Sequence, residues 1–318
     1  MTDPSPAPVM AHRLTSFAIG VGGGALGLLP WLMGGGRLPL QNLWSSATMP
    51  EDMPFVLLPL SQYYATVLFS LVLLGGTFAG IGLRFARRRR ALAVWPAVLG
   101  LAAVHLVAAI QSFGVLADGL GLAGGGDSRA GLYFAGMLAG AVVAMLLAQL
   151  ALWMTSRLSP GTAALGVALS AVPFASWFAR GVVAFTSEVT PPMFLSSIVS
   201  WLPAVIVGAA LIWCGVRPAR RLAVWLVSLL ALWIVPALFT AIQYGLGMRV
   251  LQGDVGEMAA AAADVFPMAL REIWMPTAVA LAIAVAGTVV RAIVERGGNG
   301  APQEDAPAGE DRSSTLTA

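Results

Sequence analysis

The chain has few charged residues for its length. Charged residues make up 10% of its 318 positions, whereas hydrophobic residues make up 58%. A soluble globular chain carries about 25% charged and about 45–50% apolar residues. The shortage of charge excludes an ordinary soluble domain and a disordered chain. It predicts a protein that crosses a membrane several times.

Residue types that build metal and redox sites are also scarce. The single cysteine, Cys214, permits no intrachain disulfide and no thiolate metal site. The only histidines are His12 and His105, so we predict no metal site and no cofactor. Lysine is absent, and all 18 basic residues are arginine, a bias typical of a GC-rich bacterial genome. These arginines are spread along the chain rather than gathered in one patch, so nucleic acid is not an expected partner.

Acidic residues are missing from the interior of every long apolar run. Ion- and proton-coupled carriers commonly use such a carboxylate, so its absence argues against that form of coupling. Walker A, G-x-S-x-G, H-E-x-x-H and C-x-x-C patterns are absent as well. His105 is the one titratable group deep in a run. It is the only acid or base open to an intramembrane enzyme, and a core histidine is the plainer interpretation.

Eight apolar runs are long enough to cross a bilayer, which takes about 20 residues of helix. The runs are continuous rather than alternating, which favours helices over barrel strands. We therefore predict an all-α integral membrane protein with eight transmembrane helices. A disordered tail at 1–13 precedes the helices and another at 297–318 follows them. The predicted spans are Leu14–Met33, Leu60–Leu83, Ala91–Leu116, Gly131–Met154, Thr162–Ala184, Phe194–Val216, Leu222–Leu246 and Ile273–Val294.

The arginines predict the orientation of these spans. With the amino terminus in the cytoplasm, 13 arginines lie on the inner side and 5 on the outer side. The positive-inside rule then places both termini in the cytoplasm and the spans in the cell (plasma) membrane. The densest cluster is Arg84, Arg87, Arg88, Arg89 and Arg90. We interpret this cluster as a stop-transfer and orientation signal, with binding of lipid headgroups as the alternative.

Short sequence matches indicate an internal duplication. Leu92-Ala93-Val94-Trp95 recurs as Leu222-Ala223-Val224-Trp225, and Ala109-Ile110-Gln111 recurs as Ala241-Ile242-Gln243. Pro30 and Arg37 correspond in the same order to Pro173 and Arg180, and differences in loop length explain the changes in offset. We predict two four-helix units, 14–156 and 157–296. Because each unit has an even number of spans, both enter the membrane in the same direction.

Two further patterns concern packing. Gly20 with Gly24, Gly76 with Gly80, and Gly136 with Gly140 have small-xxx-small spacing, which predicts helix packing inside the chain or, alternatively, self-association. The segment 253–272 has acids on one side and apolar residues on the other. We expect an amphipathic helix at the outer interface or over the bundle, ended by Pro267. Pro30, Pro173 and Pro203 are expected to kink their spans.

The duplicated polar residues give the functional hypotheses. A pseudo-twofold axis would bring the equivalent pairs Gln111 and Gln243, and Arg37 and Arg180, toward one outer vestibule suited to an anionic or polar ligand. The first hypothesis is a transporter- or channel-like protein with its path between the two repeats, using these four residues and His105. Interhelical hydrogen bonds and headgroup contacts are the plainer role for them. The alternative is a non-catalytic scaffold or accessory subunit of an envelope complex, bound in the lipid bilayer to a membrane protein partner or to a second copy of itself.

Overall fold

The computed structural model describes residues 6–41, 43–124, 128–186, 193–248 and 254–298. These ranges are mainly helical and contain no strand, apart from an isolated bridge between Arg37 and Phe55. The α-helices are α1 Pro6–Met33, α2 Ala65–Arg87, α3 Trp95–Gly119, α4 Ser128–Ser156, α5 Pro160–Leu169, α6 Ala171–Thr186, α7 Met193–Cys214, α8 Arg220–Gly247, α9 Val255–Glu272 and α10 Met275–Gly298. Short 3-10 turns lie at Pro50–Asp52 (η1), Gln62–Tyr64 (η2) and Leu122–Gly124 (η3).

Seven of these helices are long and apolar enough to cross a membrane, and α5 with α6 makes an eighth if the bent pair is one span. The all-helical, multi-pass prediction is confirmed at this level. Helix α1 begins at Pro6, ahead of the predicted start at Leu14, so part of the segment 1–13 is helical. The predicted tail lies outside the described residues from position 299 onward.

The fifth predicted span is broken rather than continuous. Helices α5 and α6 meet at Ser170 with a bend of 49°. Pro173 is the third residue of α6, in the first turn, where a missing N–H costs no helical hydrogen bond. The Ser170 hydroxyl donates back to the carbonyl oxygen of Gly166 over 2.8 Å. Pro30 and Pro203, by contrast, lie inside the unbroken helices α1 and α7.

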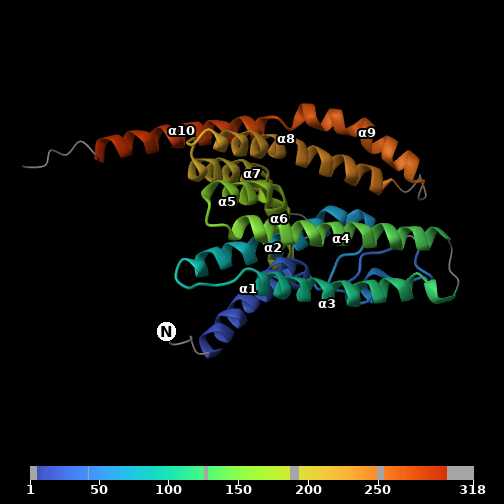
Figure 1. Ribbon diagram of the computed structural model, residues 1–318. Coiled ribbons are helices and arrows are strands. Elements are labelled where there is room, and N and C mark those ends of the chain that lie inside the picture. Colours follow the sequence, from blue (N-terminus) through green and yellow to red (C-terminus); the bar gives the residue numbers. More distant parts are fainter. Residues whose placement is uncertain (1–5, 42, 125–127, 187–192, 249–253, 299–318) are drawn as a thin grey trace, which may run out of the picture.

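The helices pack as two groups. In the first, α2 packs against α1 and α4, and α1 also packs against α3. In the second, α7 packs against α10 and against both α5 and α6, while α5 also packs against α8. Figure 1 shows α1–α4 on one side and α7–α10 on the other, with α5 and α6 between them. We call the chain up to Ser156 the first half and the chain from Arg157 the second half.

Glycines allow close approach inside the first half. A Cβ on Gly20 would lie 2.1 Å from the carbonyl oxygen of Ala97, and one on Gly76 would lie 1.9 Å from that of Ala148. Packing within the chain is therefore confirmed for these glycines. Gly136 and Gly140 behave differently, because a Cβ at either position would meet nothing within 4 Å. For this pair the prediction of packing within the chain is wrong, and both residues lie on an exposed face of α4.

The amphipathic segment forms α9, which packs along α8. The Trp233 indole donates to the carbonyl oxygen of Leu270 over 2.8 Å, and Asp254 caps the helix by accepting from the backbone N–H of Gly256. The helix continues through Pro267, so the expectation that it ends there is wrong. Its position beside α8 also replaces the expected position over the bundle.

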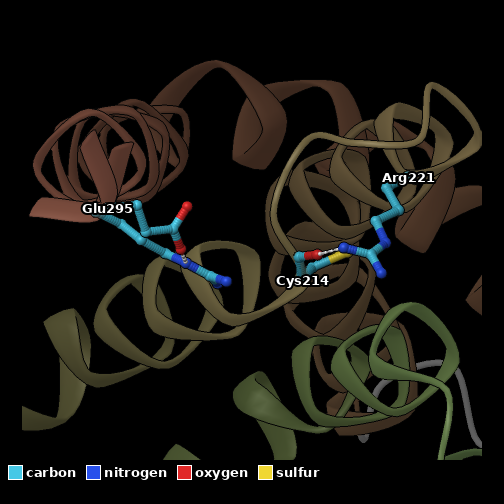
Figure 2. Close-up of polar contacts among 4 residues, drawn as sticks. Cys214, Arg221 and Glu295 are labelled. Atoms are coloured by element: carbon cyan, nitrogen blue, oxygen red, sulfur yellow. Dashed lines mark hydrogen bonds and ion pairs between the residues drawn. The ribbon is translucent and has the colours of Figure 1, made fainter. Parts of the chain in front are cut away.

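A side-chain hydrogen bond links the end of α7 to the start of α8. Figure 2 shows Arg221, near the start of α8, donating over 2.7 Å to the carbonyl oxygen of Cys214 at the end of α7. Gly215 turns the chain there with φ 70°, a left-handed conformation that favours glycine. The same figure shows Glu295 of α10, which pairs with Arg291 over 2.8 Å on an exposed face. Such surface pairs contribute little to stability.

Candidate functional site at the junction of the two halves

The connection between α1 and α2 folds back onto the bundle and forms one wall of the site. Val56 and Leu58 of this connection are fully buried. The Trp31 indole donates to the carbonyl oxygen of Val56 over 2.9 Å. Gln111 of α3 accepts from the Leu57 N–H and donates to the carbonyl oxygen of Phe55, both over 2.9 Å. We call the end of the bundle that carries this connection the outer end, after the predicted orientation.

Gln243 of α8 binds the same connection from the second half. Its Nε2 donates to the carbonyl oxygen of Tyr63 over 2.5 Å, and its Oε1 accepts from the Thr66 hydroxyl over 3.0 Å. The two glutamines of the duplicated triplet therefore each hold a different stretch of one connection. Both bind backbone or hydroxyl groups.

Arg180 of α6 lies against aromatic rings of the first half. Its Cζ is 5.4 Å from the centroid of the Trp31 ring and 5.5 Å from that of the Tyr64 ring. These two rings contact each other edge to face at 6.2 Å. The Arg180 side chain is half-buried, its Nε is buried without a hydrogen-bond partner, and it forms no ion pair with any described residue. Cation–π contacts hold the guanidinium in place, and no carboxylate of the described residues pairs with it.

Arg37 occupies a different setting from its sequence counterpart. It follows the end of α1, is exposed, and donates to the backbone carbonyl oxygen of Glu51. Arg180 instead lies within α6. Arg180 therefore contacts Trp31 and Tyr64, whereas Arg37 contacts Glu51 within the α1–α2 connection.

His105 is buried within the first half, away from the groups that hold the connection. Its side chain is 1% exposed, and neither ring nitrogen has a hydrogen-bond partner among the described residues. Gly75 of α2 makes room for it, since a Cβ there would lie 3.1 Å from His105 Nε2. The core interpretation agrees with this burial, although the imidazole remains unsatisfied.

Deeper in the molecule, the junction between the halves is filled. The Thr77 and Ser170 hydroxyls are 2.8 Å apart, and both side chains are buried. The Phe78 ring contacts the Trp177 ring edge to face at 5.2 Å, and the Trp177 indole donates to the carbonyl oxygen of Gly27 over 2.9 Å. The junction is closed at this level.

An open apolar groove lies on α6, the helix that carries Arg180. It is lined by Trp177, Phe178, Gly181, Val182 and Phe185. A Cβ at Gly181 would make only an ordinary contact of 3.7 Å with Pro30 Cγ of α1. The groove and the guanidinium are therefore neighbours on one helix.

The arginine cluster at the opposite end of the bundle divides into two sets. Arg84 is buried, its Cζ lies 4.8 Å from the Trp213 ring centroid, and its Nη2 donates to the carbonyl oxygen of Leu158 over 3.1 Å. Arg87 donates to the carbonyl oxygen of Ser156 over 3.2 Å. Arg87 thus binds the last residue of α4, where carbonyls lack helical partners, and Arg84 binds the segment between α4 and α5. The other members, Arg88, Arg89 and Arg90, are exposed and stay available for headgroups.

The groups at the outer junction are suited to binding a ligand by charge, hydrogen bonds and aromatic contact. The junction offers a guanidinium, an amide and aromatic faces, and the described residues contain no group of three potential metal ligands. Sequence reasoning missed Trp31 and Tyr64, although the Tyr63-Tyr64 pair at the start of a span was a visible signal. No family model, curated protein or solved structure matches the chain.

Proposed function

We propose that this chain is a transporter- or channel-like protein of the plasma membrane, with its path at the junction of two parallel four-helix repeats and both termini in the cytoplasm. The helix pairs support the repeats. The pairs α1–α2, α1–α3 and α2–α4 of the first half correspond to α5/α6–α7, α5–α8 and α7–α10 of the second. Parallel repeats of this kind occur in transporters, which bind substrates where the repeats meet.

The observation that carries the proposal is the position of Arg180. It comes from the second half, lies on Trp31 and Tyr64 of the first, and has no counter-ion among the described residues. Ionisable residues within membrane spans are rare and are candidates for functional sites. An anionic or polar ligand entering from outside would find this charge at the mouth of the junction.

In the described conformation the path is closed by the Thr77–Ser170 contact. Transport therefore requires α2 to separate from the joint between α5 and α6 at Ser170. The two hydroxyls would then face the path, where each can bind water or a polar ligand in place of the other.

Cysteine accessibility tests the proposal. Cys214 is the only cysteine, so Cys214→Ala gives a cysteine-free background for Thr77→Cys and, separately, Ser170→Cys. We expect a membrane-impermeant thiosulfonate reagent to modify both cysteines slowly in sealed vesicles. Ala148→Cys is the control, because Ala148 is fully buried against α2 inside one half and is expected to stay unmodified. Complete protection of Thr77→Cys and Ser170→Cys from both sides of the membrane would contradict a path.

A scaffold or accessory subunit is the second candidate, and the exposed face of α4 favours it. A Cβ at Gly136 or Gly140 would meet no described residue within 4 Å, and small residues at this spacing allow close contact with another helix. Substituting Gly140→Leu would then break an assembly in mild detergent while leaving thiol accessibility at Ser170→Cys unchanged. If the assembly stays intact in this variant, α4 is not its contact surface.

A further inference from the structure

The charge of Arg180 and the groove on α6 occupy adjacent parts of one helix. Trp177 lines the groove and lies three residues before Arg180, and Gly181 lines it directly after. Residues three apart on a helix are neighbours on its surface, so the guanidinium borders the groove at the Trp177 side. The site therefore combines one cationic group with an extended apolar surface.

From this combination we infer that the outer junction binds a phosphate that carries an apolar tail, with the phosphate at Arg180 and the tail in the groove. The inference rests on the proposed function, because it names the ligand class of the same site. A guanidinium offers two parallel N–H donors that match two phosphate oxygens. A small anion would leave the groove unused, and a neutral lipid would leave the guanidinium without a partner.

The surrounding residues favour this ligand class over a charged solute alone. Phe185, at the far end of the groove, is 79% exposed, and Phe178 and Val182 add apolar surface along the same helix. Among the described residues, no carboxylate pairs with Arg180 to repel or displace a phosphate. Both the anionic head and the apolar tail thus have a surface that is complementary to them.

Photo-crosslinking in nanodiscs of phosphatidylcholine tests the inference. The probe is a phosphatidic acid with a diazirine on its acyl chain, and the matched probe is a diacylglycerol with the same chain and no phosphate. Cross-linked peptides are mapped by mass spectrometry on the full chain. We expect the phosphatidic acid probe to label the segment 171–186, and the diacylglycerol probe to label it far less.

Three substitutions and a control sharpen the test. Arg180→Gln is expected to lower the labelling about tenfold, the effect of losing a charged hydrogen-bond pair. Arg180→Lys keeps the charge and is expected to retain most of it. Gly181→Leu fills the groove without a backbone clash and is expected to lower labelling with Arg180 intact. Arg271→Gln, on exposed α9, is the control and leaves labelling unchanged.

The remaining outcomes overturn the inference. Equal labelling by the two probes would show that the phosphate is not recognised. Full competition by inorganic phosphate would identify a free phosphate as the ligand, with no role for a tail. Unchanged labelling in folded Arg180→Gln would exclude the guanidinium.

This test fails separately from the test of the path. If specific labelling is lost while Thr77→Cys and Ser170→Cys react, the proposed path is supported and the lipid phosphate is rejected as its ligand. Specific labelling with both cysteines protected would do the reverse.

Discussion

Gln243 of α8 accepts a hydrogen bond from the hydroxyl of Thr66 at the start of α2, with 3.0 Å between the two oxygens. The same amide donates to the carbonyl oxygen of Tyr63. One side chain of the second half thus fixes the point where the α1–α2 connection becomes helix. If the junction opened, water would form these hydrogen bonds in place of Gln243. The bonds made by Gln243 therefore favour the state in which the two halves are together.

We expect Gln243→Leu to lower the stability of the protein by about 1–3 kcal/mol, because it removes the hydrogen bonds of Gln243 to the part-buried Tyr63 carbonyl and Thr66 hydroxyl. Thermal unfolding in detergent micelles measures the effect. Gln149→Leu is the matched control in α4. Its Nε2 makes only a long contact of 3.4 Å with the carbonyl oxygen of Val98, and its Oε1 has no partner. Equal losses of stability in the two variants would show that the contact of Gln243 between the halves stabilises the protein no more than the long contact of Gln149 does.

Glycine substitutions distinguish packing inside the chain from the open face of α4. Gly76→Ala forces a Cβ to 1.9 Å from the carbonyl oxygen of Ala148 and is expected to cost about 1–3 kcal/mol through overpacking. Gly140→Ala meets nothing and is expected to be neutral or to stabilise α4 by up to about 1 kcal/mol. Melting temperatures of the purified variants measure both. A large loss in Gly140→Ala would reveal a neighbour from outside the chain.

Replacing His105 by leucine is expected to preserve or raise stability. Neither ring nitrogen has a described partner, so the imidazole contributes an unsatisfied buried polar group that costs about 1–3 kcal/mol. The melting temperature of His105→Leu, beside that of Ala108→Leu as a purely steric control in the same helix, checks this. A clear loss confined to His105→Leu would mean that the imidazole binds a buried water or a ligand.

Substitutions of Arg84 and Arg90 distinguish an arginine that stabilises the fold from one that only orients the chain in the membrane. Arg84→Gln removes the stacking on Trp213 and the bond to Leu158, and we expect it to cost about 1–3 kcal/mol in thermal unfolding. Arg90→Gln removes one exposed arginine from the same cluster and is expected to change stability little. Each variant keeps most inner arginines, so both are expected to insert normally. The prediction fails if Arg90→Gln unfolds at the lower temperature.

Reporter fusions check the orientation. A phosphatase fused after Arg157, between α4 and α5, is expected to be inactive, and one fused after Gly121, between α3 and α4, is expected to be active. The physical reason is the excess of arginine on the inner side. Activity after Arg157 would place the start of the second half outside and would remove the parallel repeat.

The helical spans were predictable because a bilayer imposes a length and a composition on each of them. The break at Ser170 was harder to predict. Pro30, Pro173 and Pro203 look alike in the sequence, yet only Pro173 stands at the beginning of a new helix, a difference that arises from packing against both halves. The equivalence of Gln111 and Gln243 was visible as a repeat, but their shared target, the α1–α2 connection, was not, because tertiary structure alone brings both side chains to it. The cation–π contacts of Arg180 were likewise not predictable, because only the tertiary structure brings Trp31 and Tyr64 together beside it.

The interruption at Ser170 has a mechanical consequence. Helix α5 packs against α4 and α8, and α6 packs against α1 and α2, while both helices also pack against α7. Two short rods that share a joint can transmit different displacements, which one continuous rod cannot do. A tilt of α6 about this joint would carry Arg180 and the groove with it, and α7, which contacts both segments, would pass part of that motion to α5.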